Sequence, residues 1–241
     1  MKKKITFLLA VGLVMSCHNE EFPQDDSLAG YLANAEVQMG NVIACAASNQ
    51  NNGLVSVFLY PRPGATNIRY FEARDGAVAR DNFSAYEAVE APLLDVFNGF
   101  LKKFEVSLTN EKWVLVSFEE AGRVHLSNPI KIKNATRPTE YATNKVQVEA
   151  NTLAPLITWE EGRYDDTVIY FQVVADANGS LISGTYTTDT FFRFYDLDNV
   201  VLNITPSAAP QLQDGQVYGV TLMGVSEDNW VNLFATQGFV P

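Results

Sequence analysis

Leu54-Val-Ser-Val-Phe-Leu-Tyr60, followed directly by Pro61-Arg-Pro-Gly64, is the stretch that decides the fold class of this chain. β-branched and aromatic residues dominate the first segment, and such residues favour a strand. The proline and glycine of the second segment are typical of a turn. We therefore interpret 54–60 as a β-strand that ends in a turn.

Runs of the same kind continue along the chain after this strand. They cover 67–73, 100–108, 113–118 and 124–133, and then 145–149, 156–159, 167–175, 184–195, 200–204, 217–225 and 230–235. Short strands at this spacing, separated by turn residues, are typical of a β-sandwich or barrel. Asn134-Ala-Thr-Arg-Pro138 is polar and contains a proline, as a linker between domains does. We predict an all-β chain of two tandem Ig-like sandwiches, at 36–135 and 139–241.

The second unit carries two features of a known module. Trp159 ends the second strand of that unit, and Leu212-Gln-Asp-Gly-Gln-Val-Tyr218 places a leucine, a turn and a tyrosine in order. Both resemble the fibronectin type III family, although Asp214 stands where a proline is usual. The resemblance implies that Tyr218 forms a tyrosine corner with nearby backbone. The first unit resembles the family only in a degenerate form, and an Ig-like sandwich of another topology is the alternative there.

The N-terminus has the pattern of a bacterial lipoprotein signal. Lysines at 2–4 precede an apolar run at 5–14, and Met15-Ser16 then leads to Cys17. The apolar run is roughly ten residues long, whereas a spanning helix needs about 20. We predict that residues 1–16 are a signal peptide, that Cys17 is lipidated, and that 17–35 is an acidic tether. An uncleaved anchor or an ordinary secretory signal is the alternative.

The tether and four further stretches indicate where in the cell the protein is located. Acidic residues soon after Cys17 resemble the export signal of surface lipoproteins in Bacteroidota-type bacteria, which implies an outer-membrane protein facing outward, with the periplasmic face as the alternative. The whole chain is similar to uncharacterised lipoproteins of flavobacteria-like organisms. The stretches that carry this similarity are Asn41-Val-Ile-Ala-Cys45, Phe97-Asn-Gly-Phe100, Leu126-Ser-Asn-Pro129 and Asp228-Asn-Trp-Val-Asn-Leu233. That group implies fold and location but no activity.

Composition and charge exclude several classes of partner. Hydrophobic residues make up 47% of the chain and aromatic residues 12%, which is enough for packed cores. The formal net charge is −11, and removal of the three signal lysines takes it to −14. Nucleic-acid binding needs a basic footprint, so we expect no nucleic acid partner. Once Cys17 carries lipid, Cys45 has no disulfide partner and is interpreted as a buried small residue.

The patterns of catalytic and metal sites are missing from the sequence. His125 is the one histidine outside the tether, and no GxSxG elbow, zinc-ligand spacing or phosphate loop accompanies it. We therefore predict that the protein is not an enzyme and uses no cofactor. Asp196 and Asp198 alternate in a polar segment and are the one candidate for calcium, with a simple polar turn as the alternative.

Loop residues are the natural contacts of a sandwich. Ser226-Glu-Asp-Asn-Trp230 places a tryptophan in an acidic loop, so Trp230, Asp228 and Asn229 are candidate contacts to a glycan or a protein. The alternative is that Trp230 opens the last strand and covers the edge of the core. Arg62 is a second candidate contact. In Phe191-Phe-Arg-Phe-Tyr195, alternation predicts that one face is core. We interpret the other face as the interface between the domains, with a binding face as the alternative.

The leading functional hypothesis is an accessory lipoprotein that binds the membrane through its N-terminal lipid and presents loops to an envelope protein partner. A glycan-binding module for polysaccharide capture is the rival hypothesis. A passive structural spacer is the third.

Overall fold

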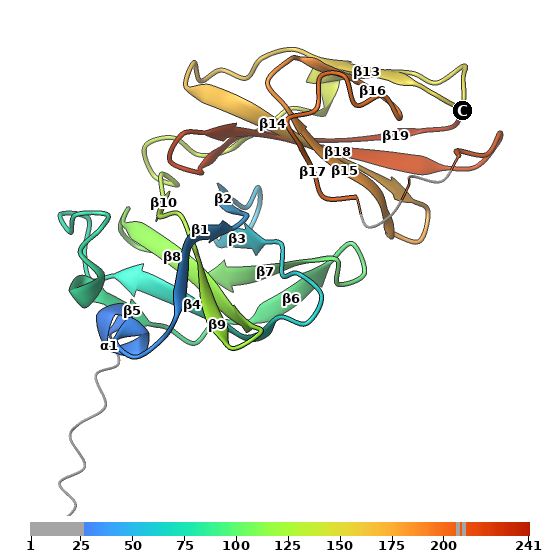
Figure 1. The fold of residues 1–241 in the computed structure, drawn as a ribbon. Helices are drawn as coiled ribbons and strands as arrows, with labels where there is room; N and C mark the ends of the chain where they lie inside the picture. The colour runs from blue at the N-terminus through green and yellow to red at the C-terminus, as the bar shows by residue number, and fades with distance from the viewer. Residues whose placement is uncertain (1–26, 206–207, 209–210) are drawn as a thin grey trace, which may run out of the picture.

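The computed structural model describes residues 27–205, 208 and 211–241, and it is built almost wholly from strands (Figure 1). The predicted signal peptide, Cys17 and most of the tether lie outside these residues. Within the described part, no helix has the length and apolar character needed to cross a bilayer. The predicted all-β fold class is confirmed.

The first sandwich consists of two sheets whose order follows from hydrogen bonding between neighbouring strands. Its outer sheet has the order β1-β9-β8-β4-β5, with β10 paired to β8, and its inner sheet has the order β2-β3-β7-β6. The strands are β1 (Val37–Val42), β2 (Ala44–Ser48), β3 (Val55–Leu59), β4 (Thr66–Ala73), β5 (Tyr86–Ala88), β6 (Leu93–Val96), β7 (Leu101–Val106), β8 (Trp113–Glu120), β9 (Arg123–Ser127) and β10 (Ile130–Lys131). A 3₁₀ turn, η1 (Phe83–Ala85), precedes β5.

The last part of the expected tether is folded. Leu28–Leu32 forms helix α1, and the Ser27 hydroxyl accepts a hydrogen bond from Gly30 N at 3.1 Å as an N-cap. Leu28 is fully buried in a cluster with Tyr86 and Leu126. The structure therefore corrects the tether boundary of residue 35, because burial of Leu28 against the outer sheet holds this segment on the sandwich.

The second sandwich also consists of two sheets. Its inner sheet has the order β11-β19-β18-β14-β15-β17, and its outer sheet has the order β12-β13-β16. The elements are β11 (Glu140–Tyr141), η2 (Thr143–Lys145), β12 (Val146–Glu149), β13 (Leu156–Trp159), β14 (Thr167–Asp176), β15 (Leu181–Thr187), β16 (Phe191–Arg193), β17 (Leu202–Asn203), β18 (Tyr218–Ser226) and β19 (Val231–Phe239).

Both predicted features of this sandwich are present. Gln213 N donates a hydrogen bond of 3.0 Å to the Tyr218 hydroxyl, which is the geometry of a tyrosine corner. Trp159 is 5% exposed and packs beside Tyr170 in the core of the sandwich. The prediction of one strand over 184–195 is wrong. Asp189 N bonds to Thr187 Oγ1 in a local turn, and the chain then crosses to the other sheet as β16.

The two sandwiches pack through their inner sheets. One apolar cluster joins Ala47 and Leu101 of the first sandwich to Phe171, Val173 and Met223 of the second. In Figure 1 the inner sheets accordingly lie between the two outer sheets. The predicted interface at Phe191, Arg193 and Tyr195 is corrected, because Phe191 is 44% exposed, whereas Phe192 on the other face is buried in the core as expected.

Candidate functional site

The loop between β18 and β19 lies against the first sandwich. The candidate contact Trp230 has no exposed surface and belongs to the core cluster of the first sandwich, although it is part of the second. Its indole Nε1 donates a hydrogen bond of 2.8 Å to the carbonyl of Arg137 in the linker. The indole is therefore not available for the predicted contact with a glycan or protein, and the alternative of a core-covering tryptophan describes it.

The two residues before Trp230 also make contacts inside the molecule. Asn229 has a φ of 61°. Its carbonyl accepts a hydrogen bond of 3.0 Å from Ala46 N, and the carbonyl of Asp228 accepts one of 2.9 Å from Lys131 N. The Asp228 carboxylate lies 2.8 Å from Lys133 Nζ. These residues bind one sandwich to the other, so the expected external contacts at Asp228 and Asn229 are made inside the molecule.

The other candidate residues stay apart from this loop. The Arg62 guanidinium donates to Glu120 at 2.9 Å, lies 2.8 Å from His125 Nδ1 and covers the ring of Phe118 at 5.0 Å. The hydrogen bond and charge of Arg62 lower the pKa of Glu120 against the opposing effect of burial. Arg62 is thus held by its own neighbours rather than presented to a ligand.

The calcium candidates lie in an exposed turn of the second sandwich. The Asp196 carboxylate accepts a hydrogen bond of 3.0 Å from Asp198 N, as in an ordinary Asx turn. The described residues contain no group of three or more histidine, cysteine, aspartate or glutamate side chains arranged for a metal.

An ion-pair network closes the junction beside Trp230. Asp166, before β14, pairs with Lys133 and Arg137 of the linker and accepts a hydrogen bond of 2.7 Å from the buried Asn232. Burial acts to raise the pKa of Asp166, but the Asn232 hydrogen bond and the two positive charges outweigh it and hold that pKa below its usual value. The folded state therefore favours ionised Asp166 more than the unfolded state does.

We expect Asp166→Asn to remove a small, pH-dependent part of the stability. A group whose pKa is lower in the folded state contributes its full stabilisation above the unfolded-state pKa of about 3.9. This contribution to the free energy of unfolding is lost as the pH falls through the folded-state pKa. The Asp166 side chain is 36% exposed, so the difference at pH 7 is about 1 kcal/mol after solvent screening. Urea titrations at pH 7 and pH 3 measure it. A wild-type–variant difference that is unchanged at pH 3 would contradict this role of Asp166.

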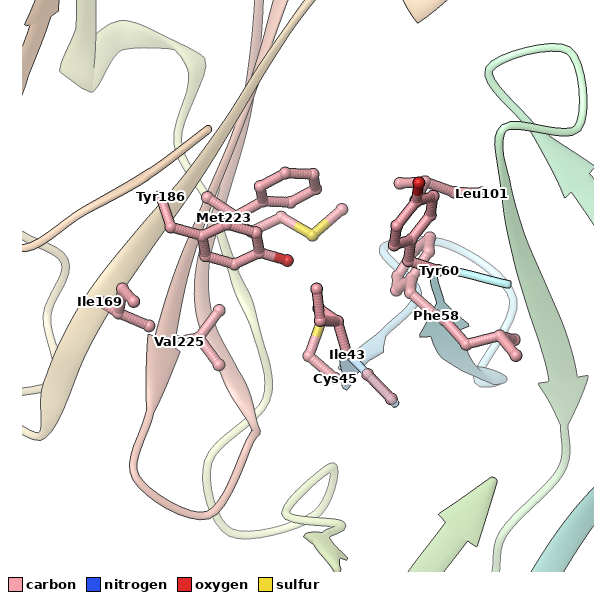
Figure 2. Close-up of a pocket in the computed structure, with 12 residues that line it drawn as sticks. Ile43, Cys45, Phe58, Tyr60, Leu101, Ile169, Tyr186, Met223 and Val225 are labelled. Carbon is pink, nitrogen blue, oxygen red and sulfur yellow. The ribbon is translucent and has the colours of Figure 1, made fainter. Parts of the chain in front are cut away.

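A narrow apolar slot lies between the inner sheets (Figure 2). Ile43, Cys45 and Tyr60 line one side, and Tyr186 and Met223 face them from the other. Burial raises the pKa of the Cys45 thiol to about 12, so the thiol is protonated at neutral pH. The slot holds about 50 Å³, whereas a cavity that binds benzene has about 150 Å³. It therefore has no room for an aromatic ligand.

A larger groove with both amide and aromatic residues in its lining opens beside this slot, at a place that the sequence analysis missed. The groove holds about 420 Å³, and we call it the amide groove because the β2–β3 loop contributes Asn49, Gln50, Asn51 and Asn52 to its wall. Half-buried Phe58 of the first sandwich and Tyr141 and Phe234 of the second complete it. The run of four amide residues at 49–52 was a signal in the sequence, but nothing there placed aromatic rings next to it.

Comparisons with known proteins find only distant structural similarity. No protein-family model and no curated protein matches it. It is similar to a domain described as a biofilm associated protein, BSP domain, with 14% identity and a TM-score of 0.25, over 83% of this chain and 29% of that one. It is also similar to the glycoside hydrolase domain of Endo-D from Streptococcus pneumoniae R6, with 12% identity and a TM-score of 0.31, over 83% of this chain and 36% of that one. The chain thus spans about a third of each of these structures, and the likeness carries no activity or partner over to it.

Proposed function

We propose that the protein is a lipid-anchored, non-enzymatic module on the outward face of the outer membrane, and that it presents a rigid β-body to an envelope protein partner. The observation that supports this most directly is the outer edge of β6. This strand pairs with β7 on one side and ends the inner sheet of the first sandwich on the other.

The edge of β6 has the properties of a docking strand. Glu105 N donates to the Pro92 carbonyl at 3.2 Å, and alternation along an antiparallel pair then directs the backbone groups of Leu93 and Asp95 away from β7. Leu93 is 38% exposed and Leu94 is 40% exposed. Free backbone groups beside exposed apolar side chains are what an extended segment of another protein pairs with.

The contacts between the sandwiches support the same proposal. The loop at 227–230, which contains Trp230, binds the first sandwich at one side of the junction. Elsewhere in the junction, Asn98 Nδ2 donates to the carbonyl of Asn178 and to Ser180 Oγ at 3.2 and 2.9 Å. A stiff body loses little conformational entropy when it binds a partner, which favours an adaptor role.

We expect the double variant Leu93→Lys/Leu94→Lys to lose its partner in intact cells. Two charges on the docking edge remove apolar contact and should lower capture about tenfold or more. The measurement is cross-linking in cells followed by pull-down of the C-terminally tagged protein. Val201→Lys/Val217→Lys changes two residues that are 59% and 55% exposed on the second sandwich and is the matched control.

The two other functional hypotheses give different results in this experiment. One captured envelope protein that disappears in the β6 variant and persists in the control supports the adaptor. The same capture by all three proteins places the contact elsewhere and overturns the β6 assignment. No capture by correctly localised wild-type protein favours a spacer or a glycan role. A glycan role through Trp230 is unsupported, because that indole is buried.

A further inference from the structure

We propose that the amide groove is a saccharide-binding site for a neutral glycan. This goes beyond the proposed adaptor function, since the groove is a different surface from the outer edge of β6. Its volume of about 420 Å³ falls within the range of about 300–1,000 Å³ that is usual for small-ligand sites. The inference rests on its amides, its rings and its charge.

The amide wall has unused hydrogen-bonding capacity. The side chains of Gln50 and Asn51 are exposed and have no hydrogen-bond partner among the described residues. Asn52 uses its oxygen to accept from Leu54 N at 3.0 Å, which leaves its NH₂ group free. Each carboxamide offers two donors and one acceptor, so a row of them matches the adjacent hydroxyl groups of a sugar ring.

The base of the loop is held in place. Asn49 Oδ1 accepts a hydrogen bond of 2.7 Å from the buried Ser56, and Asn49 N donates to the Leu54 carbonyl at 2.8 Å. Gly53 takes a φ of 70°, which lets the loop turn back into β3. The free amides therefore stand on a fixed loop, and ordering them on a ligand costs less than ordering a mobile segment.

The opposite side of the groove supplies rings from the second sandwich. Tyr141 and Phe234 lie with their ring centroids 5.2 Å apart, and the Tyr141 hydroxyl donates to the Ser48 carbonyl at 3.0 Å, which fixes its ring. Both rings are half-buried and line the groove. The face of a sugar that carries C–H groups packs on such rings, while its hydroxyls reach the amides.

The groove carries little net charge. Lys103 Nζ lies 2.6 Å from Glu105, and the Lys103 hydrogen bond holds the pKa of Glu105 below its usual value against the effect of burial. The one cation of the lining is therefore compensated. This charge balance favours a neutral sugar over an anionic polysaccharide or a charged peptide.

The test is affinity electrophoresis of the full-length protein in a polyoxyethylene detergent, through native gels that contain laminarin, dextran, xylan, mannan or polygalacturonate. We expect at least one of the neutral polysaccharides to retard the wild-type protein. Gln50→Ala/Asn51→Ala should weaken the retardation about tenfold, because two exposed amides supply the polar contacts. Because both side chains are exposed, we expect this variant to fold as the wild-type protein does. The control Gln213→Ala/Gln216→Ala removes two amides from another polar groove, which holds no aromatic pair like Tyr141 and Phe234.

Several results would overturn the saccharide site. They are no retardation by any neutral polysaccharide, retardation by polygalacturonate alone, or an equal loss in both double variants. A Gln50→Ala/Asn51→Ala protein that keeps its polysaccharide retardation but loses a cross-linked protein partner would identify the groove as a protein contact instead. The β6 variant should keep its retardation, so the saccharide site and the adaptor proposal fail independently.

Discussion

Trp230→Ala is expected to lower the free energy of unfolding by about 3–5 kcal/mol, the usual cost of deleting a buried aromatic side chain. The indole is fully buried in the core of the first sandwich and donates to the Arg137 carbonyl at 2.8 Å. Its removal leaves a cavity in one sandwich and loosens the loop that joins it to the other. Denaturant titration followed by Tyr and Trp fluorescence measures the loss.

Two further variants separate the parts of this effect. Trp230→Phe keeps an apolar ring and loses the N–H bond, so it should cost about 1–2 kcal/mol. Trp159→Ala removes a core indole of the second sandwich and should be destabilising too. Hydrogen exchange distinguishes the sites, since Trp230→Ala should speed exchange in β2 and β10 of the first sandwich. Faster exchange in the second sandwich alone would contradict the packing of Trp230 in the core of the first sandwich.

Local patterns predicted the longer strands because each depends on neighbours in the chain, whereas the short strands β5, β6 and β11 lie outside the predicted runs. The boundaries of β13 are those expected, and the order of leucine, turn and Tyr218 led to the corner that the structure contains. The break between β15 and β16 was missed for an equally local reason. Thr187 and Asp189 make a turn inside an aromatic and β-branched run, and the apolar pattern outweighed it in the interpretation.

The candidate site was less predictable, because its meaning depends on what faces it. A tryptophan in an acidic loop has the same sequence pattern whether it meets an external ligand or the next sandwich. Asp228, Asn229 and Trp230 meet the next sandwich. The amide groove could not be predicted for the opposite reason. Its amides at 49–52 and the rings of Tyr141 and Phe234 come from segments about 90 residues or more apart.

Four stretches of the sequence, at 41–45, 97–100, 126–129 and 228–233, all reach the junction between the sandwiches. Ile43 and Cys45 line the apolar slot, and Asn98 bonds to the β14–β15 turn. The Pro129 carbonyl accepts from Asn229 Nδ2 at 3.3 Å. These residues hold the two sandwiches together, so their identity is constrained by packing within the molecule.

Cys17→Ser is expected to move the protein from almost wholly membrane-bound to almost wholly soluble. In the proposed anchor the lipid is attached through the Cys17 thiol. Several acyl chains, each contributing about 0.8 kcal/mol per buried methylene, would hold the protein far more firmly than one chain does. Fractionation of cells into membrane and soluble material measures the change, and metabolic labelling with an alkyne fatty acid shows whether the chain carries lipid.

Cys45→Ser is the matched control, because it removes the only other cysteine. Cys45 lies half-buried at the junction with its pKa raised by burial, so its loss should leave both membrane binding and labelling unchanged. A Cys17→Ser protein that stays in the membrane with residues 1–16 attached would instead identify the N-terminus as an uncleaved anchor. Protease added to intact cells then separates the faces, since digestion of the wild-type protein requires that its sandwiches lie outside the outer membrane.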